Sequence, residues 1–114
     1  MPTVNINPLS VNTAWQGKRY KTKHYINYEK ELLFRLPPLK IPSGKLHIIY
    51  HIGYSNRMSD LGNMEKPFTD ILCKKYGFDD RDIYKFTMIK YVVRKGSEFI
   101  SFEIMAFDEF ELYF

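Results

Sequence analysis

The sequence predicts a small α+β domain in which a mixed β-sheet packs against two helices. Two segments carry apolar residues every three or four positions, and three others are rich in β-branched and aromatic residues. A chain of 114 residues forms one domain and buries roughly two thirds of its unfolded surface. With 45% apolar and 26% charged residues, the composition is that of a globular protein, not of a disordered tail. We therefore expect a single domain over residues 1–114.

The first third of the chain is expected to begin with a short strand over residues 4–7. A loop over residues 10–17 and an extended segment over residues 19–21 follow it. A helix is expected over residues 23–36, because apolar side chains recur there at helical spacing at Tyr25, Tyr28, Leu32, Leu33 and Leu36. Thr22 is a suitable N-cap. The helix ends at Pro37 and Pro38, since proline has no backbone N–H to donate.

The middle of the chain predicts a long strand and a second helix. Residues 45–54 alternate β-branched and aromatic side chains between two faces, which favours a strand. Residues 63–76 have the apolar spacing of a helix. Lys74 and Lys75 suit its last turn, where cations interact favourably with the helix dipole, and Gly77 suits its C-terminal end.

The last third predicts two strands and a tail. Residues 83–93 and 98–107 read as strands, joined by a hairpin-like connection over residues 94–97 that contains a glycine. The tail, residues 108–114, is acidic and aromatic. The sequence leaves open whether this tail docks on the fold, contacts a partner or is loose.

Composition also limits the location of the protein. No apolar run approaches the roughly 18 residues of a transmembrane helix. The first residues lack the basic start and apolar stretch of a secretory signal, and Cys73 is the single cysteine, so a disulfide framework is excluded. We expect a cytoplasmic protein without a membrane anchor.

Three aspartates lie at the ends of expected elements. Asp60 follows the long strand, whereas Asp79 and Asp80 follow the second helix and precede the next strand. If the two strands are neighbours, we expect these carboxylates to meet at one end of the sheet. Mg²⁺ binds a few carboxylates together with water and substrate phosphate. The residues alone leave two interpretations open, a metal site or a helix cap beside a solvated pair in a turn.

The same region resembles a family signature. Its residues are Asp60-Leu61-x-Asn63 with Lys66, Phe68-x-Asp70-x-Leu72, Gly77-Phe78 and Asp79-Asp80, preceded near the N-terminus by Pro8-Leu9-Ser10-Val11-Asn12 and the basic residues 18–23. Together these motifs resemble the RusA family of Holliday junction resolvases, small endodeoxyribonucleases of phages and prophages. The resemblance covers almost the whole chain, and the order of expected strands and helices agrees with it.

The resemblance implies a RusA-like fold and a homodimer in the cytoplasm of a bacterial host, active in DNA recombination and repair. It implies that the protein binds four-way DNA junctions and makes paired nicks with Mg²⁺, for which Mn²⁺ can substitute. By position, Asp60 and Asp80 are implied as catalytic metal ligands, with Asp79 beside them. Lys66 matches the family's functional lysine, which would contact the scissile phosphate or stabilise charge there. The alternative for Lys66 is a solvent-facing helix lysine.

One position departs from the family. The family motif has a second aspartate two residues after the first, whereas this chain has Gly62 there, and glycine supplies no ligand. Three explanations remain open. The metal is held at reduced affinity by Asp60, Asp79 and Asp80 with help from Asn63, Asp82 or water. Alternatively, the site has decayed and the protein binds junctions without cutting them, or Gly62 is an engineered change.

The charge distribution suggests where DNA is held. Residues 1–57 carry a net charge of +7 and residues 58–114 a net charge of −3. The expected phosphate contacts, which would lower affinity steeply with salt, are Lys18, Arg19, Lys21, Lys23, Arg57, Lys74 and Lys75, with His24 and Lys90 as further candidates. We expect Tyr20 to pack against the first helix, with stacking on an unpaired base as the alternative. Trp15 is expected to join the core, with a DNA-facing wedge as the alternative.

Three functions therefore compete. The first is a Mg²⁺-dependent endonuclease that resolves four-way junctions. The second is a non-catalytic junction-binding protein on a resolvase scaffold, which the glycine at position 62 favours. The third is a protein-binding inhibitor that has lost DNA contact, which draws on the acidic, aromatic tail alone.

Overall fold

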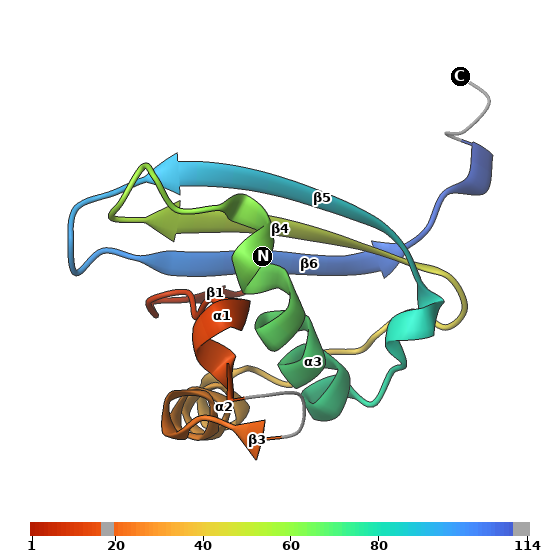
Figure 1. Ribbon diagram of the computed structural model, residues 1–114. Helices are drawn as coiled ribbons and strands as arrows, with labels where there is room; N and C mark the ends of the chain where they lie inside the picture. The colour runs from red at the N-terminus through yellow and green to blue at the C-terminus, as the bar shows by residue number, and fades with distance from the viewer. Residues whose placement is uncertain (17–19, 111–114) are drawn as a thin grey trace.

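Figure 1 shows the computed structural model, which describes residues 1–16 and 20–110. Its centre is a four-stranded sheet in the order β1-β6-β4-β5. The strands in this order are β1 (Thr3–Val4), β6 (Phe99–Ala106), β4 (Leu46–Tyr54) and β5 (Ile83–Val92). The sheet is mixed, because β4 pairs with β5 in parallel and with β6 antiparallel. A two-stranded ribbon joins Trp15–Gln16 (β2) to Tyr20–Lys21 (β3). The predicted mixed-sheet α+β class is confirmed.

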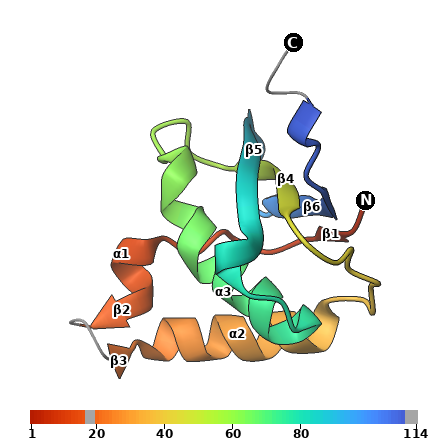
Figure 2. The ribbon, with the colours of Figure 1, turned by 90° about the vertical axis from the view of Figure 1, so that its right-hand side faces the viewer.

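The helices lie together on one face of the sheet (Figures 1 and 2). They are α1 (Val11–Ala14), α2 (Lys23–Arg35) and α3 (Glu65–Tyr76). A short 3₁₀ turn, η1 (Leu61–Met64), precedes α3, and a second one, η2 (Asp80–Asp82), follows it. The Thr22 hydroxyl accepts a hydrogen bond from Tyr25 N at 3.2 Å, as expected of an N-cap. Gly77 ends α3 with a φ of 73°, a left-handed conformation that favours glycine.

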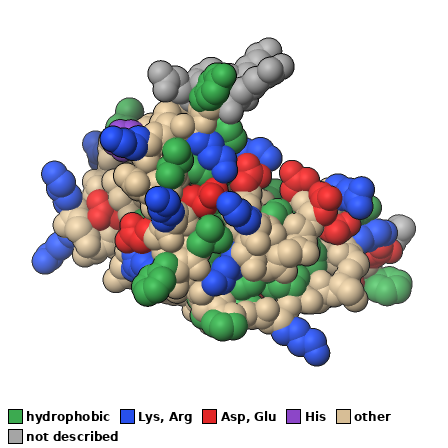
Figure 3. Space-filling model, turned by 90° about the horizontal axis from the view of Figure 1, so that it is seen from below, with side chains coloured by type: hydrophobic (Ala, Val, Ile, Leu, Met, Phe, Trp, Pro, Cys, Tyr) green, Lys and Arg blue, Asp and Glu red, His purple; other side chains and the backbone are tan. Residues whose placement is uncertain are grey.

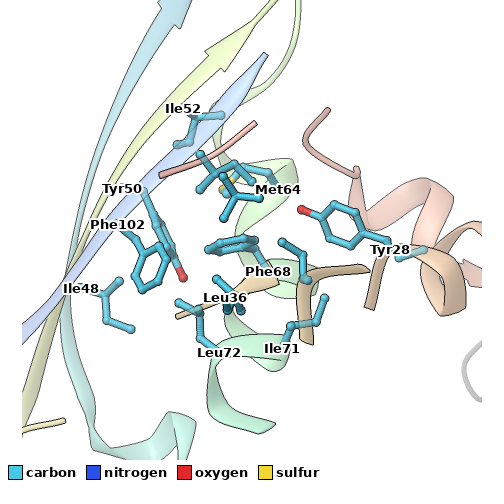
Figure 4. Close-up of a cluster of buried hydrophobic side chains, with 14 of the residues drawn as sticks. Tyr28, Leu36, Ile48, Tyr50, Ile52, Met64, Phe68, Ile71, Leu72 and Phe102 are labelled. Carbon is cyan, nitrogen blue, oxygen red and sulfur yellow. The ribbon is translucent and has the colours of Figure 1, made fainter. Parts of the chain in front are cut away.

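The core lies between this helical layer and the sheet (Figure 4). Alternate residues of β4, among them Ile48, Tyr50 and Ile52, are fully buried toward the helices. They pack against the inner face of α3, which contributes Phe68 among other buried side chains. The Tyr50 hydroxyl is buried but satisfied, because it lies 2.7 Å from Thr69 Oγ1. This packing fixes α3, and with it the loops at both of its ends.

No described element covers the opposite face of the sheet (Figure 2). Ile89, Tyr91 and Met105 are between 39 and 42% exposed, and the strand registers place all three on that face. Phe99 covers Gly53 there, and a Cβ atom at Gly53 would lie 2.4 Å from the Phe99 ring. This close contact explains why the strand carries a glycine at a position that is otherwise unfavourable for one.

The expected hairpin between the last two strands is wrong. β4 lies between β5 and β6, so residues 93–98 cross the end of β4 instead of forming a tight turn between paired strands. The physical reason is burial. β4 is the most buried strand, and seven of its nine residues are buried, so the central position suits it.

Smaller differences concern element ends. A loop is expected over residues 10–17, but α1 and β2 lie there, and the Ser10 hydroxyl accepts a hydrogen bond from Asn12 N at 3.1 Å; residue 17 is outside the described residues. A helix of four residues is too short to give a periodic apolar pattern. The first part of the tail contacts the fold, because Lys45 pairs with Glu109, and the Phe107 ring just before the tail lies 5.7 Å from that of Tyr84. Residues 111–114 lie outside the described residues.

Candidate functional site

The residues of the predicted site lie at the two ends of α3. Asp60 follows the end of β4, whereas Asp79 and Asp80 precede the start of β5. Because β4 and β5 are parallel, the end of one strand and the start of the other lie at opposite ends of the sheet (Figure 1). The expectation that the three carboxylates meet at one end of the sheet is therefore wrong. It assumed neighbouring strands without considering their direction.

Asp60 is exposed at the N-terminal end of η1, and its side chain makes no capping hydrogen bond. Its backbone oxygen accepts hydrogen bonds from Asn63 N at 3.2 Å and from the Tyr54 hydroxyl at 3.3 Å. Burial, followed by the nearby Asp60 charge, raises the pKa of Tyr54 to about 12. The Asp60 backbone is thus held in place, whereas its side chain is exposed and makes no capping hydrogen bond.

Asp79 has a structural role at the other end of α3. Its Oδ1 accepts a hydrogen bond from Arg81 N at 3.0 Å, and its Oδ2 lies 3.5 Å from Arg81 Nε. The hydrogen bond from the Arg81 backbone lowers the pKa of Asp79. Asp79 therefore caps η2, a role that the sequence did not predict for it, whereas Asp60, for which a cap was the alternative, makes no side-chain capping hydrogen bond.

Lys66 and Asp80 come together, although α3 separates them in the sequence. Lys66 Nζ donates a hydrogen bond to Asp70 Oδ1 at 2.9 Å and lies 3.5 Å from Asp80 Oδ2. The hydrogen bond with Asp70 is the main reason that the pKa of Lys66 is raised. Lys66 is therefore a solvent-facing helix lysine, with a side chain that is 54% exposed, and its charge lies beside two carboxylates.

Two further acidic residues share this place. A cavity of about 180 Å³ is lined by Glu65, Lys66, Thr69, Asp70, Asp80, Ile83 and Phe86. Burial raises the pKa of Glu65, although a hydrogen bond with Thr69 opposes the shift. Sequence reasoning assigned no role to Glu65 and gave Asp70 only a place in the motif. The spacing of four between Lys66 and Asp70 was the available signal, since such pairs meet on a helix.

Metal binding can be tested against this geometry. In residues 1–16 and 20–110, no group of three or more His, Cys, Asp or Glu side chains is placed to hold a metal ion. Asp60 lines one cavity and Asp80 lines others, and the Lys66 ammonium lies against Asp80. The arrangement does not fit a Mg²⁺ ion held jointly by Asp60, Asp79 and Asp80.

Gly62 lies in η1 with space around it. A Cβ atom built there meets no atom within 4 Å, and the backbone is outside the left-handed region. An aspartate at this position would therefore be accommodated without strain. The absence of a carboxylate at position 62 therefore reflects the residue type and not a backbone that excludes a side chain.

The predicted DNA-contacting residues differ in how free they are. Lys21 and Lys74 both pair with Glu29, at 3.1 and 2.8 Å, and Lys75 Nζ donates to Leu33 O at 2.9 Å. Lys90 Nζ is held by the backbone oxygens of the β4–α3 loop. Lys23, His24 and Arg57 are exposed. Lys18 and Arg19 lie outside the described residues. Figure 3 shows basic and acidic side chains intermixed on the α2 side, so this face is not a purely basic patch.

The two aromatic residues near the β2–β3 ribbon behave differently. Trp15 packs against the core, with its ring centroid 5.4 Å from that of Tyr25. Tyr20 is 73% exposed, so the expectation that it packs on the first helix is wrong. Trp15 already occupies the place beside Tyr25, and Tyr20 faces solvent.

None of the helices in the described parts of the chain has the length and hydropathy needed to cross a bilayer. Neither the models of known protein families nor the curated proteins include a match to this chain.

Proposed function

We propose that the protein binds four-way DNA junctions and nicks opposed strands, as a resolvase of the RusA type. The observation that carries the proposal is the contact between Lys66, in the first turn of α3, and Asp80, which follows α3 in the sequence; Lys66 Nζ and Asp80 Oδ2 are 3.5 Å apart. Both belong to the family motif, in its first and second halves. A lysine between carboxylates in a solvent-accessible cavity is the kind of charged group that a phosphodiester substrate engages.

In this proposal Lys66 leaves the carboxylates and contacts the scissile phosphate, where its charge is better compensated during the reaction. Asp80 is exposed and makes no backbone cap, so its oxygens become available when Lys66 moves. Because the three aspartates do not converge on one position, Asp80 and the substrate phosphate would hold Mg²⁺ in this proposal, and the ion would supply Lewis-acid stabilisation of a phosphate oxygen. Because Mg²⁺ accepts few protein ligands beside substrate phosphate and water, we expect it to bind weakly until DNA is present.

DNA binding is proposed to involve the exposed residues Tyr20, Lys23 and Arg57. The exposed Tyr20 ring favours the alternative of stacking on an unpaired base. Lys23 and Arg57 make no ion pair with another described residue, which leaves their charges free for phosphates. These contacts would carry little sequence information.

Cutting two opposed strands requires two copies of the site, so the active form is proposed to be a homodimer. The uncovered sheet face supports this proposal, because it carries Ile89, Tyr91 and Met105 in partly exposed positions. Light scattering in solution would give the mass of the assembly. Replacing Ile89 by lysine should produce monomers if this face is the dimer interface.

A second candidate function is junction binding without cleavage. It is favoured by Gly62 and by the described carboxylates, which do not converge on one metal position. A protein of this kind would shield junctions or obstruct other DNA-processing proteins. The third candidate, an inhibitor that acts through the tail, gains nothing from the described residues.

The test is a synthetic four-way junction, incubated with and without Mg²⁺ or Mn²⁺, with binding and nicking measured in parallel. We expect paired nicks that require the metal ion and increase at least tenfold in the Gly62→Asp variant, which restores a carboxylate where space exists. Gly62→Asn is the matched control, with similar size and no charge. Binding without nicks in every variant would reject the nuclease and leave the second candidate.

A further inference from the structure

A cavity beside Asp60 has no role in the functions discussed above. Its volume is about 360 Å³, and it lies between the N-terminal segment and the β4–α3 loop. The lining residues are Asn7, Pro8, Ser10, Tyr54, Met58, Ser59, Asp60 and Asn63. This volume is within the range of small-molecule sites, roughly 300–1,000 Å³.

The polar groups of the cavity include two side-chain amides that are not already used. Neither Asn7 nor Asn63 makes a side-chain hydrogen bond to another described residue, whereas the Tyr54 hydroxyl is engaged with Asp60 O. An amide offers donors and an acceptor together. Amides at two places of one cavity therefore match a planar ligand that carries both donors and acceptors along an edge.

The remaining walls are apolar or small. Pro8 and the 83% exposed Met58 form apolar parts of the lining, and Ser10 and Ser59 supply hydroxyl groups. Asp60 contributes negative charge, which disfavours an anion in the same space. Apolar walls, edge-reading amides and a carboxylate that accepts from an amino group are the features of a nucleobase site, and not of a phosphate site.

We propose that this cavity holds one nucleobase, turned out of the DNA strand whose backbone passes Asp60. The proposal rests on the proposed function and adds a base-reading site to it. Asn7 and Asn63 contact the hydrogen-bonding edge of the base, and Met58 packs on its face. Extrusion costs least where pairing is already interrupted, as at the branch point of a junction.

The first experiment tests the cavity without a junction. The four deoxynucleosides are titrated separately into the ¹⁵N-labelled protein, and the side-chain amide signals of asparagines are followed. We expect the Asn7 and Asn63 signals to shift with at least one nucleoside. Asn27, which lies exposed on α2 and does not line the cavity, is the internal control. Signals of Asn7 and Asn63 that stay unchanged up to solubility with all four would overturn the proposal.

The second experiment uses junctions with and without an abasic site at each of the nucleotides next to the branch point. We expect one abasic position to weaken binding by about tenfold, as for the loss of one stacked and contacted base. Asn7→Ala and Met58→Ala should weaken binding of the intact junction similarly and leave binding of that abasic junction within about twofold. Asn27→Ala is the matched control and should change neither.

The two proposals fail in distinguishable ways. Equal effects of Asn7→Ala on intact and abasic junctions would overturn the base site while junction binding, and with it the proposed function, stands. If the protein binds no junction but nucleosides shift the Asn7 and Asn63 signals, the base site stands and the proposed function is rejected. Unchanged unfolding temperatures of the variants would show that each difference reflects the cavity and not the fold.

Discussion

The segments before and after α3 both carry residues of the proposed site, but they hold these residues differently. At the N-terminal end, Asp60 and Asn63 have side chains free of described hydrogen bonds and face a cavity. In the segment after α3, Asp79 caps η2, whereas the Asp80 carboxylate reaches back to Lys66 in the first turn of α3. Polar groups that are hydrogen-bonded or ion-paired to neighbouring residues stabilise the fold, whereas polar groups without such partners at a cavity are available to a ligand. The side chains before and after α3 therefore differ in how available they are to a ligand, although the same sequence pattern singles out both sets.

The largest expected effect is that of removing the Asp80 charge. In the proposed nuclease, Asp80→Asn should reduce metal-dependent nicking by about 10²- to 10³-fold, which is typical for the loss of one group that stabilises the transition state. Junction affinity should stay within a few fold, because an uncharged amide does not repel DNA. Single-turnover nicking and fluorescence anisotropy measure the two quantities. Asp108→Asn, in the exposed tail, is the control. Unreduced nicking by Asp80→Asn would remove Asp80 from the site.

The next effect concerns the lysine that joins the two ends of the motif. Lys66→Met keeps the aliphatic stem and removes the charge, and we expect nicking to fall by about 10- to 100-fold. If Lys66 contacts a phosphate, the slope of log affinity against log salt should decrease by about 0.9. Lys40→Met, on an exposed loop, should change neither quantity. A loss of nicking with an unchanged salt slope would mean that Lys66 positions Asp70 and Asp80 and makes no phosphate contact.

The two glycines near the ends of α3 provide a matched comparison of stability. Gly77 has a φ of 73°, whereas Gly62 lies outside the left-handed region with no atom within 4 Å of a built Cβ. Gly77→Ala should therefore lower the free energy of unfolding by about 1 kcal/mol. Gly62→Ala should change it by less than about 0.5 kcal/mol. Equilibrium urea unfolding measures both, and equal losses would contradict the different backbone conformations described for the two glycines.

Local rules predicted the elements better than their arrangement. The cap at Thr22 and the stop at Gly77 depend on neighbouring residues, and both are confirmed. The strand order failed, because residues 94–97 fit a hairpin as well as a crossing over β4. The expected meeting of Asp60 with Asp80 failed for another reason, because β4 and β5 are neighbours but parallel, so the end of β4 and the start of β5 lie at opposite ends of the sheet. Pairing between distant strands is set by burial over the whole sheet, which no short segment encodes.

Exposure was also hard to predict from the sequence. Tyr20 and Trp15 are both aromatic residues near the basic segment, yet Trp15 packs on Tyr25 and Tyr20 is exposed. Only the β2–β3 register decides which one faces the helices. The cavity beside Asp60 likewise unites residues 7–10 with residues 54–63. Nothing in either segment alone indicates that the other lies opposite.

The smallest expected effects come from Glu29 on α2, which holds Lys74 at the C-terminal end of α3 together with Lys21. Burial opposes ionisation of Glu29, but hydrogen bonds from Lys74 and Lys21 outweigh it and lower its pKa. A lowered pKa in the folded state stabilises the fold above the unfolded value of about 4.3, and this contribution is lost as pH falls through the folded value. Glu29→Gln should therefore lower the free energy of unfolding at pH 7 by roughly 0.5 to 1 kcal/mol.

The same substitution releases two lysines that were expected to contact DNA. If Lys21 and Lys74 reach phosphates once they are free, Glu29→Gln should tighten junction binding several fold and steepen the salt slope by up to about 1.8. Glu31→Gln is the matched control. Glu31 lies on the same helix, and among the described residues its one ion-pair partner is Arg35, so its loss frees neither Lys21 nor Lys74. If binding is unchanged, the DNA path does not cross the Glu29 side of α2. If binding weakens, Glu29 instead positions these lysines for DNA. The ion pairs of Glu29 at the C-terminal end of α3 then stabilise the fold and also hold the lysines where DNA binds.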